Sequence, residues 1–240
     1  MEYTVSPLGD ESVVIQLSES ISVETQTHIG AIAVYLDNHP ISGMVEYIPA
    51  YTTIAIFYNA VDVLAENHSD GTNAFDIVQR EIEKMVSQLP ENPETESNVI
   101  EIPVCYGGEF GPDLEVVARH NNLSEQEVID THANGDYMVY MIGFAPGFPF
   151  IGGMSEKIAT PRKDSPRLQI PAGSVGIAGS QTGVYPIETP GGWQLIGRTP
   201  IKLFRPDEEV PILLKSGDSI RFFPISEQAY HNWGAGSHEY

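Results

Sequence analysis

Glycine and proline dominate one quarter of this chain and limit the folds that it can adopt. Residues 143–197 carry 11 of the 22 glycines, in three segments that alternate with short β-prone runs. Glycine permits positive φ and close backbone approach, and proline stiffens loops. Short strands separated by frequent turn residues favour a closed or rolled β-barrel. The runs expected as strands are Gln169–Ile170, Val175–Ala178, Val184–Ile187, Gln194–Ile196, Ile201–Phe204, Ile212–Leu214 and Ile220–Phe223.

The N-terminal part shows a different pattern, typical of an α+β domain. Ser12–Leu17 is strand-like, and Val23–Asn38 has apolar residues at helical spacing. Met44–Ile48 and Thr53–Tyr58 are β-rich runs separated by a short turn, so we expect a hairpin. A second helix is predicted over Asn73–Leu89. We therefore expect a small α+β domain over residues 1–89.

A polar stretch with two prolines, residues 90–98, is predicted to be a linker because it shows no apolar period. The second domain, residues 99–240, should open with strand Val99–Tyr106 and a short helix over Pro112–Asn121. Ser124–Glu127 is a capping box that opens another helix, and Tyr137–Ile142 is strand-like. The fold class predicted is therefore an α+β domain followed by a mainly-β barrel.

Charge is distributed unevenly along the chain. With 33 acidic and 12 basic residues the formal charge is -21, which repels phosphate backbones and anionic membranes. We expect no nucleic-acid and no membrane partner, although such acidity also simply maintains solubility. Between Lys157 and Arg205, however, seven bases face two acids. This basic island favours an anionic small ligand or an acidic protein patch; the open alternative is that its bases pair with the protein's own acids.

Cys105 is the only cysteine, so no intrachain disulfide can form, which fits a reducing compartment. The N-terminus lacks the pattern of a signal peptide, and no apolar run approaches the ~20 residues of a membrane span. We expect a cytoplasmic protein. Cys105 lies in an alternating apolar run, which favours a buried strand cysteine over a nucleophile.

The chain lacks the motifs of a self-contained ATPase, serine hydrolase or zinc hydrolase. It has no phosphate-binding G-x-x-x-x-G-K-[ST] loop, no G-x-S-x-G nucleophile elbow and no H-E-x-x-H, so we expect no metal site. His132 ends a predicted helix just before the glycine-rich segments. It is a candidate general acid/base, or a cap that interacts with the helix dipole.

Six motifs follow one another in the second half of the chain. They are Tyr140–Gly153, Thr160–Arg162, Ser165–Arg167, Pro171–Gly179, Gln181–Pro186 and Pro190–Pro200. Together they resemble the allophanate-hydrolase-subunit-1-like family, which holds the B subunits of 5-oxoprolinase and Kip-type inhibitors of a sporulation sensor histidine kinase. The resemblance covers about Tyr140–Phe204 by motif and the whole chain by length, and its single departure is Ala145, where leucine is expected.

The resemblance implies a cyclophilin-like barrel and two partner proteins, 5-oxoprolinase subunits A and C. One is a homologous larger barrel subunit and the other a separate subunit. The assembled complex opens 5-oxoproline to L-glutamate with ATP, and this chain alone binds no cofactor. The Kip-type members imply a second role, inhibition of autophosphorylation of a sensor histidine kinase through the N-terminal domain. The alternative is a purely regulatory kinase-binding protein without a catalytic role.

Opening a lactam with ATP requires donors for a carboxylate and an oxyanion, and an acid/base. From the motif positions we hypothesise a catalytic group of Arg162, Arg167 and His132, in which the arginines clamp the substrate carboxylate. Backbone N–H groups would bind the oxyanion and two side chains would orient the ring. The residues of this substrate-binding group are Gly173, Ser174, Gly176, Gln181 and Tyr185.

A binding protein would instead use an apolar groove suited to a peptide or helix of the kinase. The residues expected to line this partner groove are Phe144, Phe148, Phe150 and Trp193. A third interpretation, a prolyl isomerase, rests on the barrel type alone, because nothing in the sequence supplies that active site.

Overall fold

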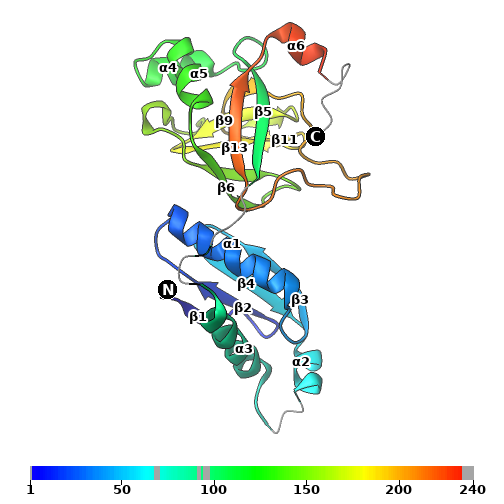
Figure 1. Ribbon diagram of the computed structural model, residues 1–240. Helices are drawn as coiled ribbons and strands as arrows, with labels where there is room; N and C mark the ends of the chain where they lie inside the picture. Colours follow the sequence, from blue (N-terminus) through cyan, green and yellow to red (C-terminus); the bar gives the residue numbers. More distant parts are fainter. Residues whose placement is uncertain (1, 68–70, 91–92, 94–97, 234–240) are drawn as a thin grey trace. The chain divides into compact units, whose positions relative to one another are not determined.

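The computed structural model describes residues 2–67, 71–90, 93 and 98–233. The chain divides into two compact units, Met1–Glu96 and Ser97–Tyr240 (Figure 1). The linker predicted over residues 90–98 lies mostly outside the described residues, so its boundaries stay a prediction. None of the helices in the described ranges is both long and apolar enough to cross a membrane.

The N-terminal unit is a four-stranded antiparallel sheet with helices packed on it. The strand order is β1-β2-β4-β3, and the predicted hairpin of β3 and β4 is confirmed. The bounds are β1 Thr4–Pro7, β2 Ser12–Gln16, α1 Val23–Asn38, β3 Met44–Pro49, β4 Thr53–Tyr58, α2 Ala60–Glu66 and α3 Ala74–Gln88.

One hydrophobic core joins the sheet of this unit to α1 and α3. Ile32 of α1, Ile56 of β4 and Ile82 of α3 are each fully buried in the same cluster. A hydrogen bond of 3.0 Å from Tyr35 Oη to Gln88 Oε1 links the two helices. Because both helices share one core, they cover the same face of the sheet.

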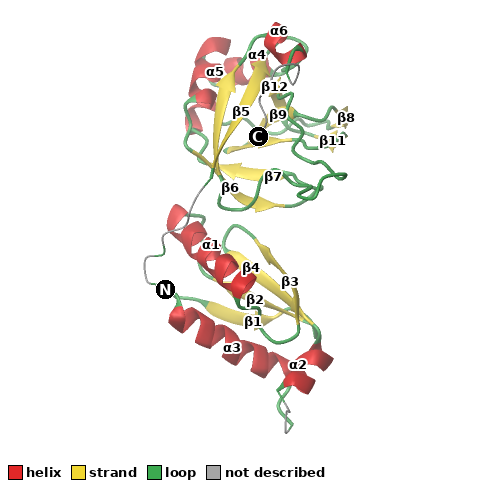
Figure 2. Cartoon of the chain, turned by 45° about the vertical axis from the view of Figure 1, so that its right-hand side comes forward, coloured by secondary structure: helices red, strands yellow, loops and turns green. Residues whose placement is uncertain are grey.

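The C-terminal unit is built on a closed barrel of seven strands, in the order β10-β7-β6-β13-β5-β12-β9 (Figure 2). The predicted closed barrel is therefore confirmed, whereas its likeness to cyclophilin stays a prediction. Strands β5 and β13 are parallel neighbours, and the other pairs are antiparallel. The bounds are β5 Val99–Tyr106, β6 Tyr137–Ile142, β7 Pro149–Gly152, β9 Ser174–Ala178, β10 Gln181–Val184, β12 Gln194–Arg198 and β13 Ser219–Pro224.

The barrel interior is filled by branched and aromatic side chains, among them Val104, Val175, Ile196 and Phe222, which are at most 1% exposed. The capping box at Ser124 is confirmed, since its side chain and that of Glu127 cap each other's backbone. Strands β8 and β11 form a separate two-stranded sheet (Figure 2). The remaining elements are α4 Leu114–His120, α5 Glu125–Ala133, η1 Glu156–Ile158, β8 Arg167–Ile170, β11 Thr189–Gly191 and α6 Glu227–His231.

Some predicted strands are wrong. The runs 201–204 and 212–214 are not strands, because they meet only through a single bridge between Phe204 and Ile212. The strand expected at Val184–Ile187 lies earlier, at Gln181–Val184, where it pairs with β9. Elements β1, α2, β7 and β11 were not anticipated. They are three to seven residues long, too short for a periodic pattern to emerge.

Candidate functional site

An aromatic cluster on the outside of the barrel explains two of the glycines. Gly176 of β9 and Gly183 of β10 are register partners, and together they form a flat floor beneath Trp193. A Cβ on Gly183 would lie 2.9 Å from Trp193 Cζ3, and one on Gly176 would lie 3.1 Å from Trp193 Cβ. Phe148 contacts this indole edge to face, with ring centroids 5.7 Å apart. These glycines therefore permit close packing of the indole.

The four aromatic residues predicted to line a partner groove divide into two kinds. Phe148 and Trp193 are 2% and 5% exposed and belong to the packed cluster, so they are not free surface. Phe150 is partly buried against the same cluster. Phe144 touches the cluster only at its edge, where its ring centroid lies 5.5 Å from that of Phe148. It is 71% exposed and holds a φ of +71°, which is unusual for a bulky side chain. The structure thus offers one exposed aromatic ring where the sequence predicted four.

The predicted carboxylate clamp is partly occupied by the protein itself. Arg167 Nη2 donates to Asp113 Oδ1 at 2.8 Å, and Lys163 Nζ donates to the same oxygen at 3.2 Å. The backbone N–H of Leu195 donates to Asp113 Oδ2 at 2.7 Å. Two bases of the island therefore pair with an internal acid, as the open alternative held. Arg167 Nη1 is buried and has no partner among the described residues.

Asp113 is the charged centre of this arrangement and is 3% exposed. Burial works to raise its pKa. The hydrogen bonds from Arg167, the Leu195 N–H and Lys163, together with the Arg167 charge, outweigh burial and lower that pKa. The residue was missed in the sequence because it lies within the helix predicted over Pro112–Asn121, and its two cationic partners are 50 and 54 residues away along the chain. Here its side chain does not cap the helix and binds two cations instead.

Arg162, another base of the island, forms no ion pair within the described part of the chain. Its guanidinium carbon lies 5.9 Å from the centroid of the Trp193 ring, in cation–π range. The buried Tyr185 hydroxyl accepts a hydrogen bond from the backbone N–H of Trp193. Burial raises the Tyr185 pKa, and the charges of Arg162 and Arg167 oppose that rise. The structure therefore brings four predicted residues together. We call the set Arg162, Arg167, Tyr185 and Trp193 the aromatic–basic surface.

The other predicted substrate-binding residues do not join it as free groups. The N–H of Gly173 donates to Tyr185 O at 2.7 Å and that of Ser174 to Pro171 O at 3.2 Å. These N–H groups are therefore already satisfied, and the oxyanion role has no support in this geometry. Gln181 begins β10, four residues before Tyr185, so an extended chain separates the two by about 13 Å.

His132 lies inside the barrel unit with an exposed fraction of 0%. Thr182 Oγ1 donates to Gly176 O at 3.1 Å, so it accepts from His132 Nε2 at 2.9 Å. Nδ1 therefore accepts from Tyr106 Oη at 2.7 Å. Burial lowers the His132 pKa to about 3. A neutral imidazole with both nitrogens engaged and no access to solvent gives the proposed acid/base role no support.

Cys105 is buried on β5, as predicted. Burial raises the pKa of its thiol, and the charges of Glu227 and Glu109 raise it further. A thiol of raised pKa is a poor nucleophile.

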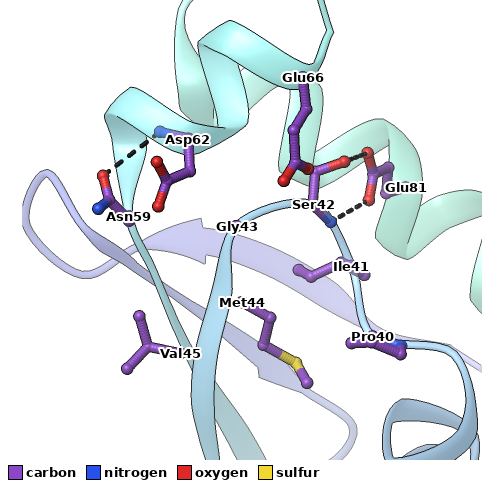
Figure 3. A pocket seen from close by; sticks show the side chains of 10 residues that line it. All are labelled: Pro40, Ile41, Ser42, Gly43, Met44, Val45, Asn59, Asp62, Glu66 and Glu81. Carbon is purple, nitrogen blue, oxygen red and sulfur yellow. Dashed lines mark hydrogen bonds between the residues drawn. The ribbon is translucent and has the colours of Figure 1, made fainter.

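The N-terminal unit contains a hollow of about 550 Å³ beside α2 (Figure 3). Three carboxylates line it, those of Asp62, Glu66 and Glu81. Glu81 is fixed by Ser42, whose backbone N–H and hydroxyl donate to its two oxygens at 2.8 and 2.6 Å. No signal in the sequence pointed to this hollow, because its lining comes from three separate stretches of the chain.

Comparison with known proteins agrees with the motifs. Residues 3–214 match the family described as carboxyltransferase domain, subdomain C and D. The chain is 52% identical over 231 residues to a Bacillus subtilis protein named as the B subunit of 5-oxoprolinase, covering 96% of each chain. It is 45% identical to the Escherichia coli O157:H7 protein of that name, covering 92% of this chain and 95% of the relative.

A solved structure extends the likeness to three dimensions. The crystal structure of TTHA0988 superposes with a TM-score of 0.76 at 32% identity, covering 90% of this chain. This chain spans only 40% of the longer TTHA0988 chain. With a family match over most of its length and relatives above 30% identity, the chain belongs to the family of carboxyltransferase subdomain C and D proteins that includes those named as B subunits of 5-oxoprolinase.

Proposed function

We propose that this chain is the B subunit of an ATP-dependent 5-oxoprolinase that opens 5-oxoproline to L-glutamate. The observation that carries the proposal is the 52% identity, over 96% of both chains, with a protein named as that subunit. The chain acts in the cytoplasm together with the two other subunits of the enzyme. The assembled complex uses the ATP, and this chain contributes one surface of the reaction site.

The aromatic–basic surface supplies a cation for that reaction. The substrate carries one carboxylate, and lactam opening with ATP passes through a phosphorylated lactam oxygen and attack of water on the ring carbon. Arg162 is held over Trp193 without an ion pair in the described residues, so its charge is available to that carboxylate. Arg167 is a positioning residue in this proposal, because Asp113 already binds it. The acid/base group comes from a partner subunit.

Exposed apolar side chains near the same surface support a heteromeric complex. Phe144 is 71% exposed and Leu168, on β8 next to Arg167, is 90% exposed. Among the described strands β8 pairs with β11 alone, so the edge of β8 that faces away from β11 has no neighbouring strand there. A partner subunit that covers these residues would bury apolar area that is costly to leave in water.

The test is reconstitution. Extract from cells lacking this chain is assayed for ATP-dependent conversion of 5-oxoproline to glutamate, with and without the purified protein. Activity should return with the native chain and with Arg221→Ala, whose exposed side chain lies on β13, and should fall at least about tenfold with Arg162→Ala. Unrestored activity with the native chain would rule out the subunit role. Full activity of Arg162→Ala would rule out the binding of the substrate carboxylate by Arg162 but would leave the subunit role in place.

A second function has an observation of its own in the N-terminal unit. Residues 1–98 hold 16 acidic and two basic residues, and three of the carboxylates face the hollow beside α2. We propose that this face binds a basic patch of a sporulation sensor histidine kinase and inhibits its autophosphorylation. Charge complementarity of this kind sets partner choice and the rate of encounter.

The test measures autophosphorylation of the purified kinase with and without the full chain. The pair Asp62→Asn with Glu66→Gln should weaken inhibition. The charge-matched pair Glu115→Gln with Asp130→Asn, which lies in the barrel unit, should leave it unchanged. Equal effects of both pairs would mean that only overall charge matters, and absence of inhibition by the native chain would remove the kinase role.

A further inference from the structure

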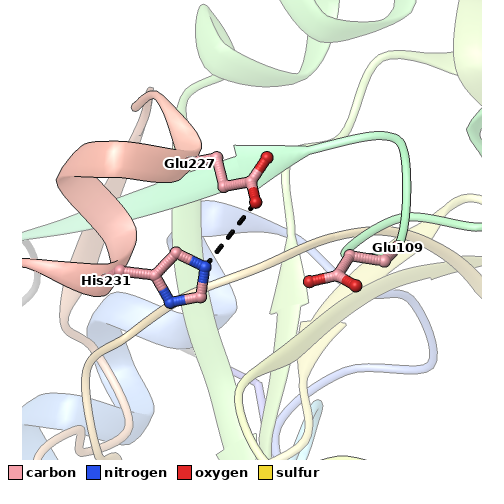
Figure 4. Close-up of side chains that lie close together, drawn as sticks. All are labelled: Glu109, Glu227 and His231. Atoms are coloured by element: carbon pink, nitrogen blue, oxygen red, sulfur yellow. Dashed lines mark ion pairs between the residues drawn. The ribbon is translucent and has the colours of Figure 1, made fainter.

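A second cluster of functional groups lies in the barrel unit, made of residues that the proposed reaction does not use. Glu227 and His231 project from α6, and Glu109 projects from the loop that follows β5 (Figure 4). One donor atom from each of the three residues lies within 4.8 Å of the other two. His231 Nε2 is 3.7 Å from Glu227 Oε1. We call these residues the Glu–Glu–His cluster.

The local structure holds these three side chains in position. Glu227 and His231 are four residues apart on α6, so they share one face of the helix. Ser226 caps that helix with a hydrogen bond from the Ala229 N–H. Phe110, directly after Glu109, is 5% exposed, and its ring centroid lies 4.6 Å from that of Tyr230. This contact holds the loop against the helix. The backbone therefore keeps Glu109 close to Glu227 and His231, although the three side chains themselves are exposed.

The charges of the cluster are incompletely compensated by the protein. Glu109 forms no ion pair with any described residue, and Glu227 pairs only with His231, which is charged only when protonated. Arg198 packs over the neighbouring Phe110 ring at 5.8 Å but forms no ion pair in the described part of the chain. Two adjacent carboxylates in a protein of charge -21 repel each other, and a bound cation would relieve that repulsion.

The donor set selects the kind of cation. One imidazole nitrogen with two carboxylate oxygens suits Zn²⁺ and similar transition metals, whereas Mg²⁺ and Ca²⁺ prefer oxygen ligands throughout. Ligands on a tetrahedral Zn²⁺ at about 2.1 Å lie roughly 3.4 Å from one another. The present spacing therefore requires about 1 Å of side-chain movement, which exposed side chains allow. Sequence reasoning missed the set because Glu109 lies more than a hundred residues from α6.

We infer that Glu109, Glu227 and His231 form a Zn²⁺-type site that ties α6 to the loop after β5, with water completing the coordination. The proposal stands apart from the aromatic–basic surface, and nothing in it depends on 5-oxoprolinase activity. Since the ion would bridge two elements, its binding should stabilise the C-terminal end of the barrel unit.

The test uses the full chain without a purification tag, stripped with a chelator and titrated with ZnCl₂ by calorimetry. We expect one equivalent bound with micromolar affinity. Glu109→Gln and His231→Gln should each weaken binding at least about tenfold, while His120→Gln, an exposed histidine at the end of α4, should not. In the same buffers Zn²⁺ should raise the melting temperature of the native chain but not that of His231→Gln.

A spectroscopic arm identifies the ligands. Co²⁺ in place of Zn²⁺ should give visible absorption bands of a four- or five-coordinate site in the native chain, and His231→Gln should abolish them. Absence of saturable binding at one equivalent would overturn the proposal. So would binding of unchanged affinity in both cluster variants, since the site would then lie elsewhere in the chain.

Discussion

Acidification should destabilise the barrel unit because the imidazole of His132 is buried in its neutral form. Burial lowers its pKa from 6.5 to about 3, so between these values the unfolded chain binds a proton that the folded barrel does not. The free energy of unfolding must therefore fall as the pH falls through that window. The slope approaches about 1.4 kcal/mol per pH unit, which amounts to about 2.5 kcal/mol between pH 7 and pH 4.5.

The hydrogen bonds of His132 suggest a control variant for this prediction. Tyr106 Oη donates to Nδ1, and Nε2–H donates to Thr182, whose hydroxyl donates onward to Gly176 O. Glutamine offers one donor and one acceptor but does not titrate in this range. His132→Gln should therefore lower the free energy of unfolding at pH 7. It should lose less of that free energy on acidification than the native chain, because glutamine does not titrate. The many carboxylates affect both proteins alike and cancel in the comparison.

Urea unfolding followed by tryptophan fluorescence reports on the barrel unit, since both tryptophans lie in residues 97–240. Measured at half-unit steps from pH 7 to 4.5, the stability gap between the native chain and His132→Gln should shrink by about 2.5 kcal/mol. Parallel curves for the two proteins would refute the reasoning. So would an NMR titration that shows the His132 ring protonated near pH 6.

Three further substitutions test the packing of the site. Asp113→Asn should destabilise the barrel by about 1–3 kcal/mol at pH 7 in urea unfolding, because it removes the counter-charge of two partly buried cations and weakens hydrogen bonds to a buried carboxylate. In the native chain the part of this stability that depends on the ionised carboxylate is present above pH 3.8 and should be lost as the pH falls from there through the lowered pKa of Asp113. Gly183→Ala should displace Trp193, shift its fluorescence and cost about 1–3 kcal/mol, whereas Gly192→Ala, whose new Cβ meets nothing closer than 3.6 Å, should cost far less. Phe144→Gly removes both the strain of the positive φ and the edge-to-face contact with Phe148, which are of similar size and opposite sign. It should therefore change the free energy of unfolding by less than about 1 kcal/mol, while weakening assembly with the partner subunits in pull-down assays.

Long periodic segments made the larger elements predictable from sequence. The bounds of Val23–Asn38 and Val99–Tyr106 were right to the residue, and the Ser124 capping box marked its helix correctly. Short elements failed because their formation depends on distant partners. Strand β11, for instance, is three residues long and exists by pairing with β8.

Only those residues of the candidate site that lie within the sequence motifs could be predicted. The motifs placed Arg162, Arg167, Tyr185 and Trp193 in one region, and the structure brings them together. They gave no indication of Asp113, because it lies outside the six motifs and its ion pair with Arg167 joins residues 54 apart. His132 shows another limit, because its place beside the glycine-rich segments gave no indication that it lies in the core with an exposed fraction of 0%.

The glycine-rich motifs therefore carry two kinds of information. Gly176 and Gly183 are explained by the indole that lies on them, so family resemblance at these positions reports barrel packing and not chemistry. Phe144 and Arg162 differ from these glycines, because each touches the cluster at its edge only. Phe144 keeps a 71% exposed ring at a positive φ, and Arg162 carries an exposed charge without an ion pair among the described residues. Burial of that ring by a partner would be favourable, and that cation could bind a substrate carboxylate, so mutagenesis that tests the proposed function should begin with these two residues.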